Sequence, residues 1–350
     1  MDHDVSFVVA GRLDARTGGS IYNRRIVETL RTQGWSVDVR ELPGAFPRPD
    51  DEAVEFATGV FSNMPSGRVV VVDGLAASAL PGVLELHAAR LRLVMLVHLP
   101  IAADVGLDEA TAARFRQSES RSLASAALVM VTGAATLPLL ADHGVAADRV
   151  ALVEPGTDAA PAARGTPGGE VHLLSVATLN PGKGHDVLLQ ALARVPAINW
   201  QLMCAGSTTR DPVTAARVQA LAHSLGLQDR VRFTGELNGE ALDRAYDAAD
   251  VFVLATRQET YGMAVAEALA RCLPIVSTTT GAIPALVGDE AGLLVPPGDV
   301  EALAHALTRV IGDEALRRRL RAGAAGVRSR LPSWDEAARR FGAALEGLST

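Results

Sequence analysis

The chain has 350 residues, of which 48% are hydrophobic and only 4% aromatic, and its formal net charge is −7. This length suggests roughly two domains of about 150 residues each. The acidic balance excludes a general nucleic-acid binder, which normally presents a basic face. Cores so poor in aromatic residues must be built from Val, Leu, Ile and Ala, as in buried parallel sheets covered by helices.

The two cysteines and the first residues of the chain bear on its compartment. Cys204 and Cys272 both adjoin apolar runs, which favours small buried thiols over a disulfide framework or a zinc site. The first four residues are acidic and lead directly into a predicted strand, so we expect no signal peptide. No apolar run approaches the ~20 residues of a membrane helix. The sequence therefore predicts a cytoplasmic protein.

Apolar runs bounded by turn residues alternate with helix-length stretches along the whole chain. The strands expected in the first half cover residues 5–10, 36–40, 68–73, 91–97, 127–131 and 150–153. Those expected in the second half cover residues 171–177, 200–205, 231–233, 251–255, 275–277 and 292–295. Expected helices include residues 22–32, 110–126, 185–193, 213–225, 239–248, 263–271 and 300–311. This alternation predicts an α/β fold with doubly wound parallel sheets and right-handed crossovers.

A stretch rich in Pro, Gly and Ala separates the two halves and has neither helical nor strand periodicity. We therefore predict an N-terminal domain at residues 1–158, a linker at 159–169 and a C-terminal domain at 170–332. The last segment, residues 333–350, is expected to be a helix, because Trp334, Phe341 and Leu345 recur at helical spacing and Ser333 stands at a capping position. In sheets of this kind ligands bind beyond the carboxyl ends of the strands.

Two features of the first half stand at such strand ends. Thr17-Gly18-Gly19-Ser20 follows the first strand, and its two glycines allow backbone to approach a ligand at the start of a helix. A plain strand–helix turn explains this loop equally well. His98 ends the apolar run 91–97, which makes it a candidate for the site rather than a structural histidine alone.

In the second half, Lys183 lies in the stretch Asn180-Pro181-Gly182-Lys183-Gly184, directly after the first strand. Its ammonium and the start of the next helix are both suited to a diphosphate. A solvated lysine is the alternative. The stretch is not a P-loop, since no Ser or Thr follows the lysine, and it is not a GxGxxG fingerprint, which disfavours an NAD-dependent oxidoreductase.

The most specific signal is the loop and helix start after the strand at 251–255. Glu259 lies in the loop, Gly262 marks a tight turn, and Glu267 lies two turns into the helix. Carboxylates at these positions suit sugar hydroxyls and a ribose diol, and the amides of Tyr261, Gly262 and Met263 suit phosphate. Glu267 has almost wholly apolar neighbours, and a carboxylate in such surroundings is expected to have a partner.

We predict no metal site. No Asp-x-Asp stands at a strand end, and Asp2-His3-Asp4 has the spacing but precedes the first strand. A bound diphosphate would have to be neutralised by cationic side chains and helix dipoles.

Together these segments resemble the retaining GT-B glycosyltransferases of family 4, also called glycosyl transferases group 1. Glu259 and Glu267 match that family's E-x7-E motif, and Lys183-Gly184 matches its K-G pair. The stretch from Gly281 to Pro284, followed by Gly292 to Asp299, resembles its closing G-x-x-P…G-x-L-V-x-x-x-D pattern. The resemblance spans nearly the whole chain, and its C-terminal half is the more specific. It implies two Rossmann-like domains that face each other across a cleft, with the terminal helix returning to the N-terminal domain.

The resemblance also implies roles for the motif residues. Lys183 would bind the donor diphosphate and Glu267 the nucleotide ribose. Glu259, with the amides of Tyr261–Met263, would hold the donor sugar and phosphate, and His98 would contact the sugar near its anomeric centre. We therefore take His98 and Glu259 as the catalytic candidates. The remaining positions, which border the base or the acceptor side, are Gly206, Glu236 and Leu237, and Gly18, Gly19, Ser20 and Asn23.

Two departures from the family pattern stand out. The family commonly has an arginine five residues before the lysine, where this chain has Thr178, and Arg257 on a neighbouring strand is our candidate for the missing cation. The family's G-x-P-E also ends in Ala285 here, so that carboxylate is lost.

The predicted function is transfer of a sugar, with retention, from a UDP- or GDP-sugar to an acceptor, without a metal or other cofactor. The acceptor class stays open among small molecules, glycans and lipid-linked sugars. Basic residues on the N-terminal helices are better explained as solvated faces than as a membrane contact. The alternatives are a nucleotide-sugar epimerase or phosphorylase on the same fold, and a non-catalytic nucleotide-sugar-binding protein.

Overall fold

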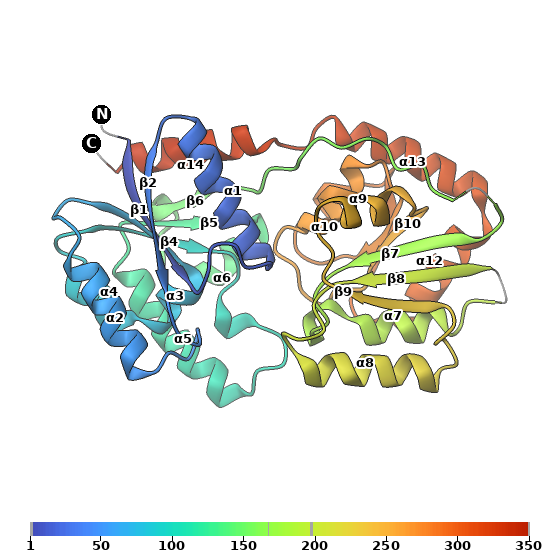
Figure 1. The fold of residues 1–350 in the computed structure, drawn as a ribbon, viewed down its shortest axis with the longest axis horizontal. Coiled ribbons are helices and arrows are strands. Elements are labelled where there is room, and N and C mark those ends of the chain that lie inside the picture. The colour runs from blue at the N-terminus through green and yellow to red at the C-terminus, as the bar shows by residue number, and fades with distance from the viewer. Residues whose placement is uncertain (1–2, 167, 197–198, 349–350) are drawn as a thin grey trace. The chain divides into compact units, whose positions relative to one another are not determined.

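The structure is a computed structural model that describes residues 3–166, 168–196 and 199–348. Parts of the expected linker and of the expected terminal helix lie outside the described residues. The chain forms two compact units (Figure 1). Unit 1 comprises Met1–Gly156 and Pro332–Thr350, and unit 2 comprises Thr157–Leu331.

Unit 1 is built on a parallel sheet of six strands in the order β2-β1-β3-β4-β5-β6. The strands are β1 Asp4–Ala10, β2 Ser36–Leu42, β3 Val69–Asp73, β4 Arg92–Val97, β5 Leu128–Val131 and β6 Val150–Leu152. The helices are α1 Gly18–Thr32, α2 Asp51–Ser62, α3 Gly74–Ala79, α4 Pro81–His87, α5 Glu109–Ala124, α6 Leu137–Ala141 and α14 Trp334–Glu346, with short 3-10 turns η1 Ile101–Ala103, η2 Ala134–Thr136 and η3 Ala147–Arg149.

Unit 2 is built on a second parallel sheet of six strands in the order β12-β11-β10-β7-β8-β9. The strands are β7 Val171–Val176, β8 Trp200–Ala205, β9 Val231–Gly235, β10 Val251–Leu254, β11 Ile275–Thr278 and β12 Gly292–Val295. The 3-10 turn η4 Pro181–Lys183 precedes the helices α7 His185–Leu192, α8 Pro212–Ser224, α9 Gly239–Asp247, α10 Met263–Ala270, α11 Ile283–Val287, α12 Val300–Gly312 and α13 Glu314–Arg328.

The α/β prediction and all twelve expected strands are confirmed. The inner strands, such as β3, β4 and β10, are buried on both faces and therefore leave continuous apolar runs in the sequence. Helix starts are marked by side chains that accept backbone N–H groups, as Asp108 does for α5 and Asp299 for α12. The helix α1 begins at Gly18, four residues before the expected start, because Thr17 caps it there.

Both cysteines are buried as expected, and burial raises the pKa of Cys204 to about 12.

Each sheet reverses its strand order at one place, and this decides where the loops gather. In unit 1 the reversal lies between β1 and β3, and in unit 2 it lies between β7 and β10. Connections from such a pair of neighbouring strands leave toward opposite faces, so a crevice opens beyond their carboxyl ends. The loops after β1, β3, β7 and β10 therefore occupy the positions at which α/β sheets bind ligands.

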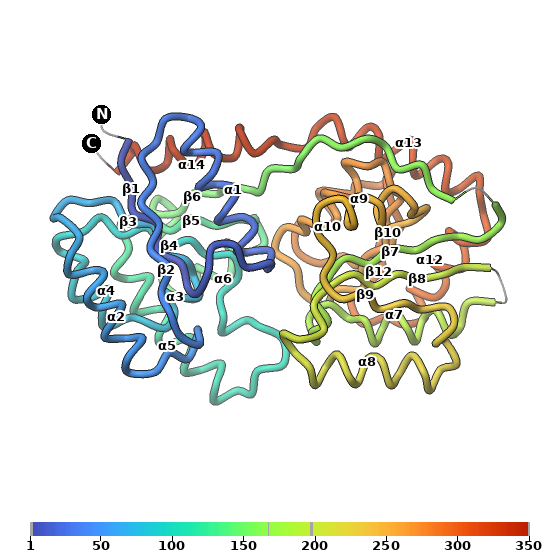
Figure 2. The backbone as a smooth tube through the Cα atoms, in the orientation of Figure 1, coloured from blue at the N-terminus to red at the C-terminus, as the bar shows by residue number. Residues whose placement is uncertain are grey.

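The end of the chain packs on its beginning. In Figure 2 the red terminal segment runs beside the blue start of the chain, and α14 packs against α1. Phe341 of α14 stacks on Phe7 of β1, with ring centroids 6.2 Å apart. Residues 159–166 have no helix or strand, yet they pack on unit 2, where Ala163 is buried and Thr166 bonds to Asp250 through backbone and hydroxyl.

Candidate functional site

The loops after β7, β8 and β9 lie against one another at one edge of the sheet of unit 2. A Cβ on Gly206, after β8, would lie 1.8 Å from the carbonyl oxygen of Ala177, after β7. The N–H of Gly206 donates to the carbonyl of Gly235, the last residue of β9. Glycine at position 206 therefore allows three strand ends to meet. Glu236 in the β9 loop pairs with Arg210, with Nε and Oε1 3.3 Å apart, and Leu237 packs at the rim of the core.

The turn that carries Lys183 is tightly specified. The side chain of Asn180 accepts the N–H of Lys183 at 3.1 Å and closes the turn η4. Gly184 follows with a φ of 63°, and α7 begins at the next residue. A Cβ at Gly184 would lie 2.0 Å from the carbonyl oxygen of Ala255, at the end of β10. Only glycine accommodates both this conformation and this approach.

The ammonium of Lys183 lies 2.6 Å from a carboxylate oxygen of Glu259. The two residues are 76 positions apart in the sequence, and both side chains are largely buried. They meet because β7 and β10 are neighbours in the sheet. The pair joins two residues that the sequence analysis singled out separately.

The loop after β10 ends on a glycine that starts a helix. Gly262 has a φ of 98° and forms the N-terminal boundary of α10, so the N–H groups of the first turn are not used within the helix. Gly281 fits closely beneath the loop, since its Cβ would lie 1.8 Å from the carbonyl oxygen of Glu259. Tyr261 is buried and Met263 is half-buried at this helix start. The start of α10 thus resembles other helix N-termini that bind anions.

Glu267 has the partner that its apolar surroundings required. The hydroxyl of Tyr246, on α9, donates to Oε2 of Glu267 at 2.9 Å. Burial raises the pKa of Glu267, and the Tyr246 hydrogen bond and the charge of Arg271 oppose that rise. The carboxylate is therefore held in one orientation at a polar point on an otherwise apolar helix.

Arg257 is engaged within unit 2. Its guanidinium makes a two-pronged pair with Asp186, at 2.9 and 2.8 Å, and donates to the carbonyl of Pro181 at 2.8 Å. Asp186 holds the pKa of the guanidinium above its usual value through this hydrogen bond. Arg257 therefore ties the β10 loop to the Lys183 turn. Thr178, where the family commonly has arginine, is half-buried in the β7 loop.

In unit 1 a second polar cluster lies beyond the carboxyl ends of β3 and β4. The amide of Asn23, on α1, donates to Asp73 at 2.6 Å, and Nε2 of His98 lies 3.1 Å from Oδ1 of Asn23. Nδ1 of His98 lies 3.3 Å from the hydroxyl of Thr132. The Asp73 carboxylate can only accept, so the amide NH2 of Asn23 faces Asp73 and the amide oxygen of Asn23 faces His98. The ring of His98 therefore donates from Nε2 to Asn23 and accepts at Nδ1 from the hydroxyl of Thr132.

The glycine-rich loop fits closely over this histidine. A Cβ on Gly19 would lie 2.9 Å from Cδ2 of His98, whereas one on Gly18 would meet nothing within 4 Å. The hydroxyl of Thr17 accepts the N–H of Ser20 at 3.0 Å and caps α1. Burial lowers the pKa of His98, which the nearby Asp73 opposes, so the ring is neutral at pH 7.

Replacing Asp73 with asparagine is expected to lower the free energy of unfolding by about 1–3 kcal/mol, because asparagine offers one acceptor oxygen to two donors, the amide of Asn23 and the N–H of Leu75. Asp73 is only 5% exposed and also accepts the N–H of Leu75 at 2.9 Å. Chemical denaturation measures the change. The control is Asp38→Asn, which removes an exposed ion pair with Arg40 and should cost less than about 1 kcal/mol. Equal losses in the two variants would contradict the role of Asp73.

Sequence reasoning missed four residues of these clusters: Asp73, Thr132, Asp186 and Tyr246. The sequence does mark Asp73 as a candidate site residue, because it ends the apolar run of β3 in the same way that His98 follows the apolar run of β4. The sequence does not mark Thr132, Asp186 or Tyr246, because the partner of each lies at a distant position in the chain.

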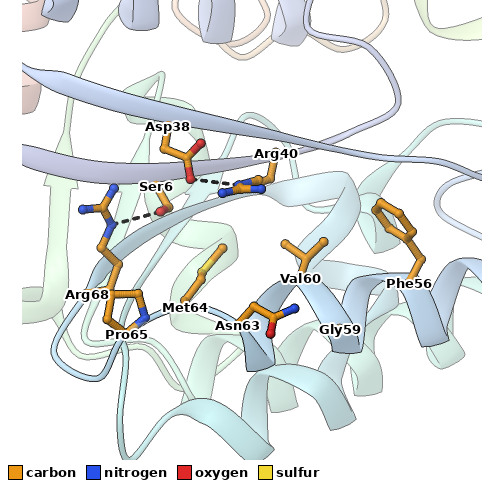
Figure 3. Close-up of a pocket in the computed structure, with 10 residues that line it drawn as sticks. All are labelled: Ser6, Asp38, Arg40, Phe56, Gly59, Val60, Asn63, Met64, Pro65 and Arg68. Carbon is orange, nitrogen blue, oxygen red and sulfur yellow. Dashed lines mark hydrogen bonds and ion pairs between the residues drawn. The ribbon is translucent and has the colours of Figure 1, made fainter.

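A cavity of about 550 Å³ lies between β2 and α2 in unit 1, away from these residues (Figure 3). The basic side chains that line it are already paired. Figure 3 shows Arg40 directed at Asp38, at 2.8 Å, and Arg68 directed at Ser6, at 3.0 Å. It lies near the amino ends of the strands, opposite the edge at which such sheets bind ligands.

Among residues 3–166, 168–196 and 199–348, no helix is long and apolar enough to cross a membrane. The same described residues contain no group of three or more His, Cys, Asp or Glu side chains placed to hold a metal ion.

Two parallel sheets with these strand orders define a Rossmann-like, doubly wound α/β class of protein. Solved structures share the fold of the whole chain. A sucrose-phosphate synthase from Thermosynechococcus elongatus matches with a TM-score of 0.82 and 23% identity over 99% of both chains. The Anabaena protein HepE in complex with UDP and glucose matches with a TM-score of 0.75 and 17% identity over 98% of this chain and 99% of that one. The chain therefore has the GT-B fold.

Residues 157–326 match the family described as glycosyl transferases group 1. A D-inositol 3-phosphate glycosyltransferase from Xylanimonas cellulosilytica is 34% identical over 232 residues, which make up 61% of this chain and 55% of that protein. The chain thus spans about half the length of the curated relatives it matches. The resemblance found in the sequence is confirmed, and unit 2 is a glycosyl transferases group 1 domain.

Proposed function

We propose that this protein is a retaining glycosyltransferase that moves a sugar from a UDP- or GDP-sugar to an acceptor. The observation that carries the proposal is the meeting of Lys183, Glu259 and the start of α10 where the sheet of unit 2 reverses its strand order. A cation, a helix start and a carboxylate at that point match the diphosphate and the sugar of such a donor.

Each part of the donor has a partner of suitable chemistry. Lys183 and the N–H groups at the start of α10 bind the diphosphate, and Glu267 accepts hydrogen bonds from the ribose diol. In the structure Glu259 neutralises Lys183. A bound diphosphate takes over the ammonium and leaves the Glu259 carboxylate for the hydroxyls of the sugar.

Catalysis in this proposal rests on positioning and on stabilising the departing diphosphate. Charge builds on the leaving phosphate as the bond to the sugar breaks, and Lys183 and the helix start offset it. The leaving phosphate takes the acceptor proton on the face of attack, which retains the anomeric configuration. Glu259 and Glu267 bind the donor and do not act as nucleophiles, and no metal is required.

A second candidate is a non-catalytic nucleotide-sugar-binding protein. It is favoured by the absence of an arginine at Thr178 and by the engagement of Arg257 with Asp186, which together leave one cation fewer for the diphosphate. Under this alternative, donor binding is retained and transfer is absent.

The test is a thermal-shift screen with UDP-, GDP- and ADP-sugars, because a ligand of the folded state raises the unfolding temperature. Each stabilising donor is then incubated with a panel of acceptors, with and without EDTA. Acceptor-dependent release of nucleoside diphosphate and a product with the donor's anomeric configuration support the proposal. Stabilisation without turnover supports the binding protein, and no stabilisation by any donor rejects both.

A further inference from the structure

The side chain of Tyr246 contacts Glu267, the residue proposed to bind the ribose. Tyr246 lies on α9, is fully buried and stacks on Phe252, with ring centroids 6.2 Å apart. Its hydroxyl lies 2.9 Å from Oε2 of Glu267 on α10 and 3.4 Å from the carbonyl of Ala264. A tyrosine in an apolar core normally places its hydroxyl on a polar partner, and here that partner is a carboxylate.

We propose that Tyr246 is a positioning residue that orients the Glu267 carboxylate toward the nucleotide ribose. The tyrosine hydroxyl occupies one carboxylate oxygen and leaves the other for the ribose diol. This inference rests on the proposed function and adds to it a residue 21 positions away from Glu267 in the sequence. Tyr246 makes no contact with the donor, and its effect is exerted through Glu267.

Arg271 contacts both Tyr246 and Glu267. Its guanidinium lies 4.4 Å from the centre of the Tyr246 ring and donates to the backbone carbonyl of Glu267 at 3.2 Å. It is held in turn by Asp243, at 2.5 Å. The aromatic ring is thus fixed between Phe252 and a cation, so the hydroxyl has little freedom to leave the carboxylate.

The charges around Glu267 give the inference a pH signature. The groups that face its carboxylate are Tyr246 and Asp243 on α9, Arg271 directly after α10, and Asp158 from the segment that precedes β7. Tyr246 and Arg271 favour the ionised carboxylate, whereas burial and the two aspartates disfavour it. Loss of the tyrosine hydroxyl therefore moves the pKa of Glu267 further upward, and nucleotide binding should require a higher pH.

The experiment compares Tyr246→Phe, Glu267→Gln and the double variant with the wild-type chain. The dissociation constants of UDP and GDP are measured by calorimetry between pH 5 and 8. For the nucleotide that the wild type binds, Tyr246→Phe should weaken binding about tenfold, because one hydrogen bond to a charged group is lost. Its pH dependence should shift upward. In the Glu267→Gln background, Tyr246→Phe should add little, since both changes act on one carboxylate.

A second measurement needs no ligand. The pKa of Glu267 is raised by burial, so the stability it contributes is present below its unfolded pKa and declines as pH rises through the folded value. Tyr246→Phe should move this decline to higher pH, and in the Glu267→Gln background that movement should vanish. Denaturant midpoints between pH 4 and 8 record it.

The outcomes separate this inference from the proposed function. Unchanged nucleotide affinity and pH dependence in Tyr246→Phe, or losses that add fully to those of Glu267→Gln, overturn the positioning role and leave the proposed function standing. A wild-type chain that binds neither UDP nor GDP, nor any donor in the thermal-shift screen, overturns the proposed function and with it the ribose role of Glu267.

Discussion

Replacing Lys183 with alanine is expected to weaken binding of the donor nucleotide and to slow transfer by a factor of about 100 to 1,000. The ammonium of Lys183 is the cation that the structure places against Glu259, at 2.6 Å, beside the start of α10. Its removal takes away the charge that faces the diphosphate. It also leaves the Glu259 carboxylate without its cation in a largely buried place, where it repels a bound anion. Calorimetry with UDP and GDP, and transfer rates with the donor found by screening, measure the two effects.

Two further variants separate the lost attraction from the added repulsion. Lys183→Ala combined with Glu259→Gln should bind nucleotide more tightly than Lys183→Ala alone, because the unpaired carboxylate is gone. The matched control is Arg194→Ala, which removes an exposed cation paired with Glu301 elsewhere in unit 2 and should change neither binding nor rate. Full transfer activity in Lys183→Ala with every donor used by the wild type would reject this site.

Gly184→Ala is expected to cost about 3 kcal/mol or more of stability and to displace the Lys183 turn. The residue has a φ of 63°, which is strained for alanine, and the new methyl group would lie 2.0 Å from the carbonyl oxygen of Ala255. That oxygen belongs to backbone at the end of β10 and has nowhere to move without disturbing the neighbouring strand. Chemical denaturation measures the loss, and nucleotide binding by the surviving folded fraction should also be weakened.

The control for this prediction is Gly226→Ala, also in unit 2. Gly226 has a φ of 69°, but a Cβ there would meet nothing within 4 Å. Its substitution therefore carries only the conformational cost, about 1 kcal/mol. The difference between the two variants isolates the contact with Ala255. Equal losses of unfolding free energy in the two variants would show that the backbone around Gly184 relaxes at no energetic cost and that the turn is not rigid.

The sequence by itself determined the architecture and the most specific motif. Inner strands that are buried on both faces, such as β4 and β10, require unbroken apolar runs, and this makes them predictable from the sequence. Glu259 and Glu267 were recognisable because a loop, a glycine and a helix start lie within one short stretch. The helices α2 and α13 were not among those expected by name. Their polar outer faces and capping aspartates provide a weaker signal than an apolar run.

The tertiary structure alone decided which of these residues act together. Strand order within a sheet is not local information. Only the adjacency of β7 and β10 brings Lys183 to Glu259 across 76 residues, and only the order β1-β3-β4 joins Asn23, Asp73 and His98. The same adjacency places Arg257 against Asp186. The sequence gives no sign of this pair, because the two residues are far apart in the chain. Short-range patterns fix elements because they reflect burial, whereas the pairing of charges depends on which strand ends become neighbours once those elements pack.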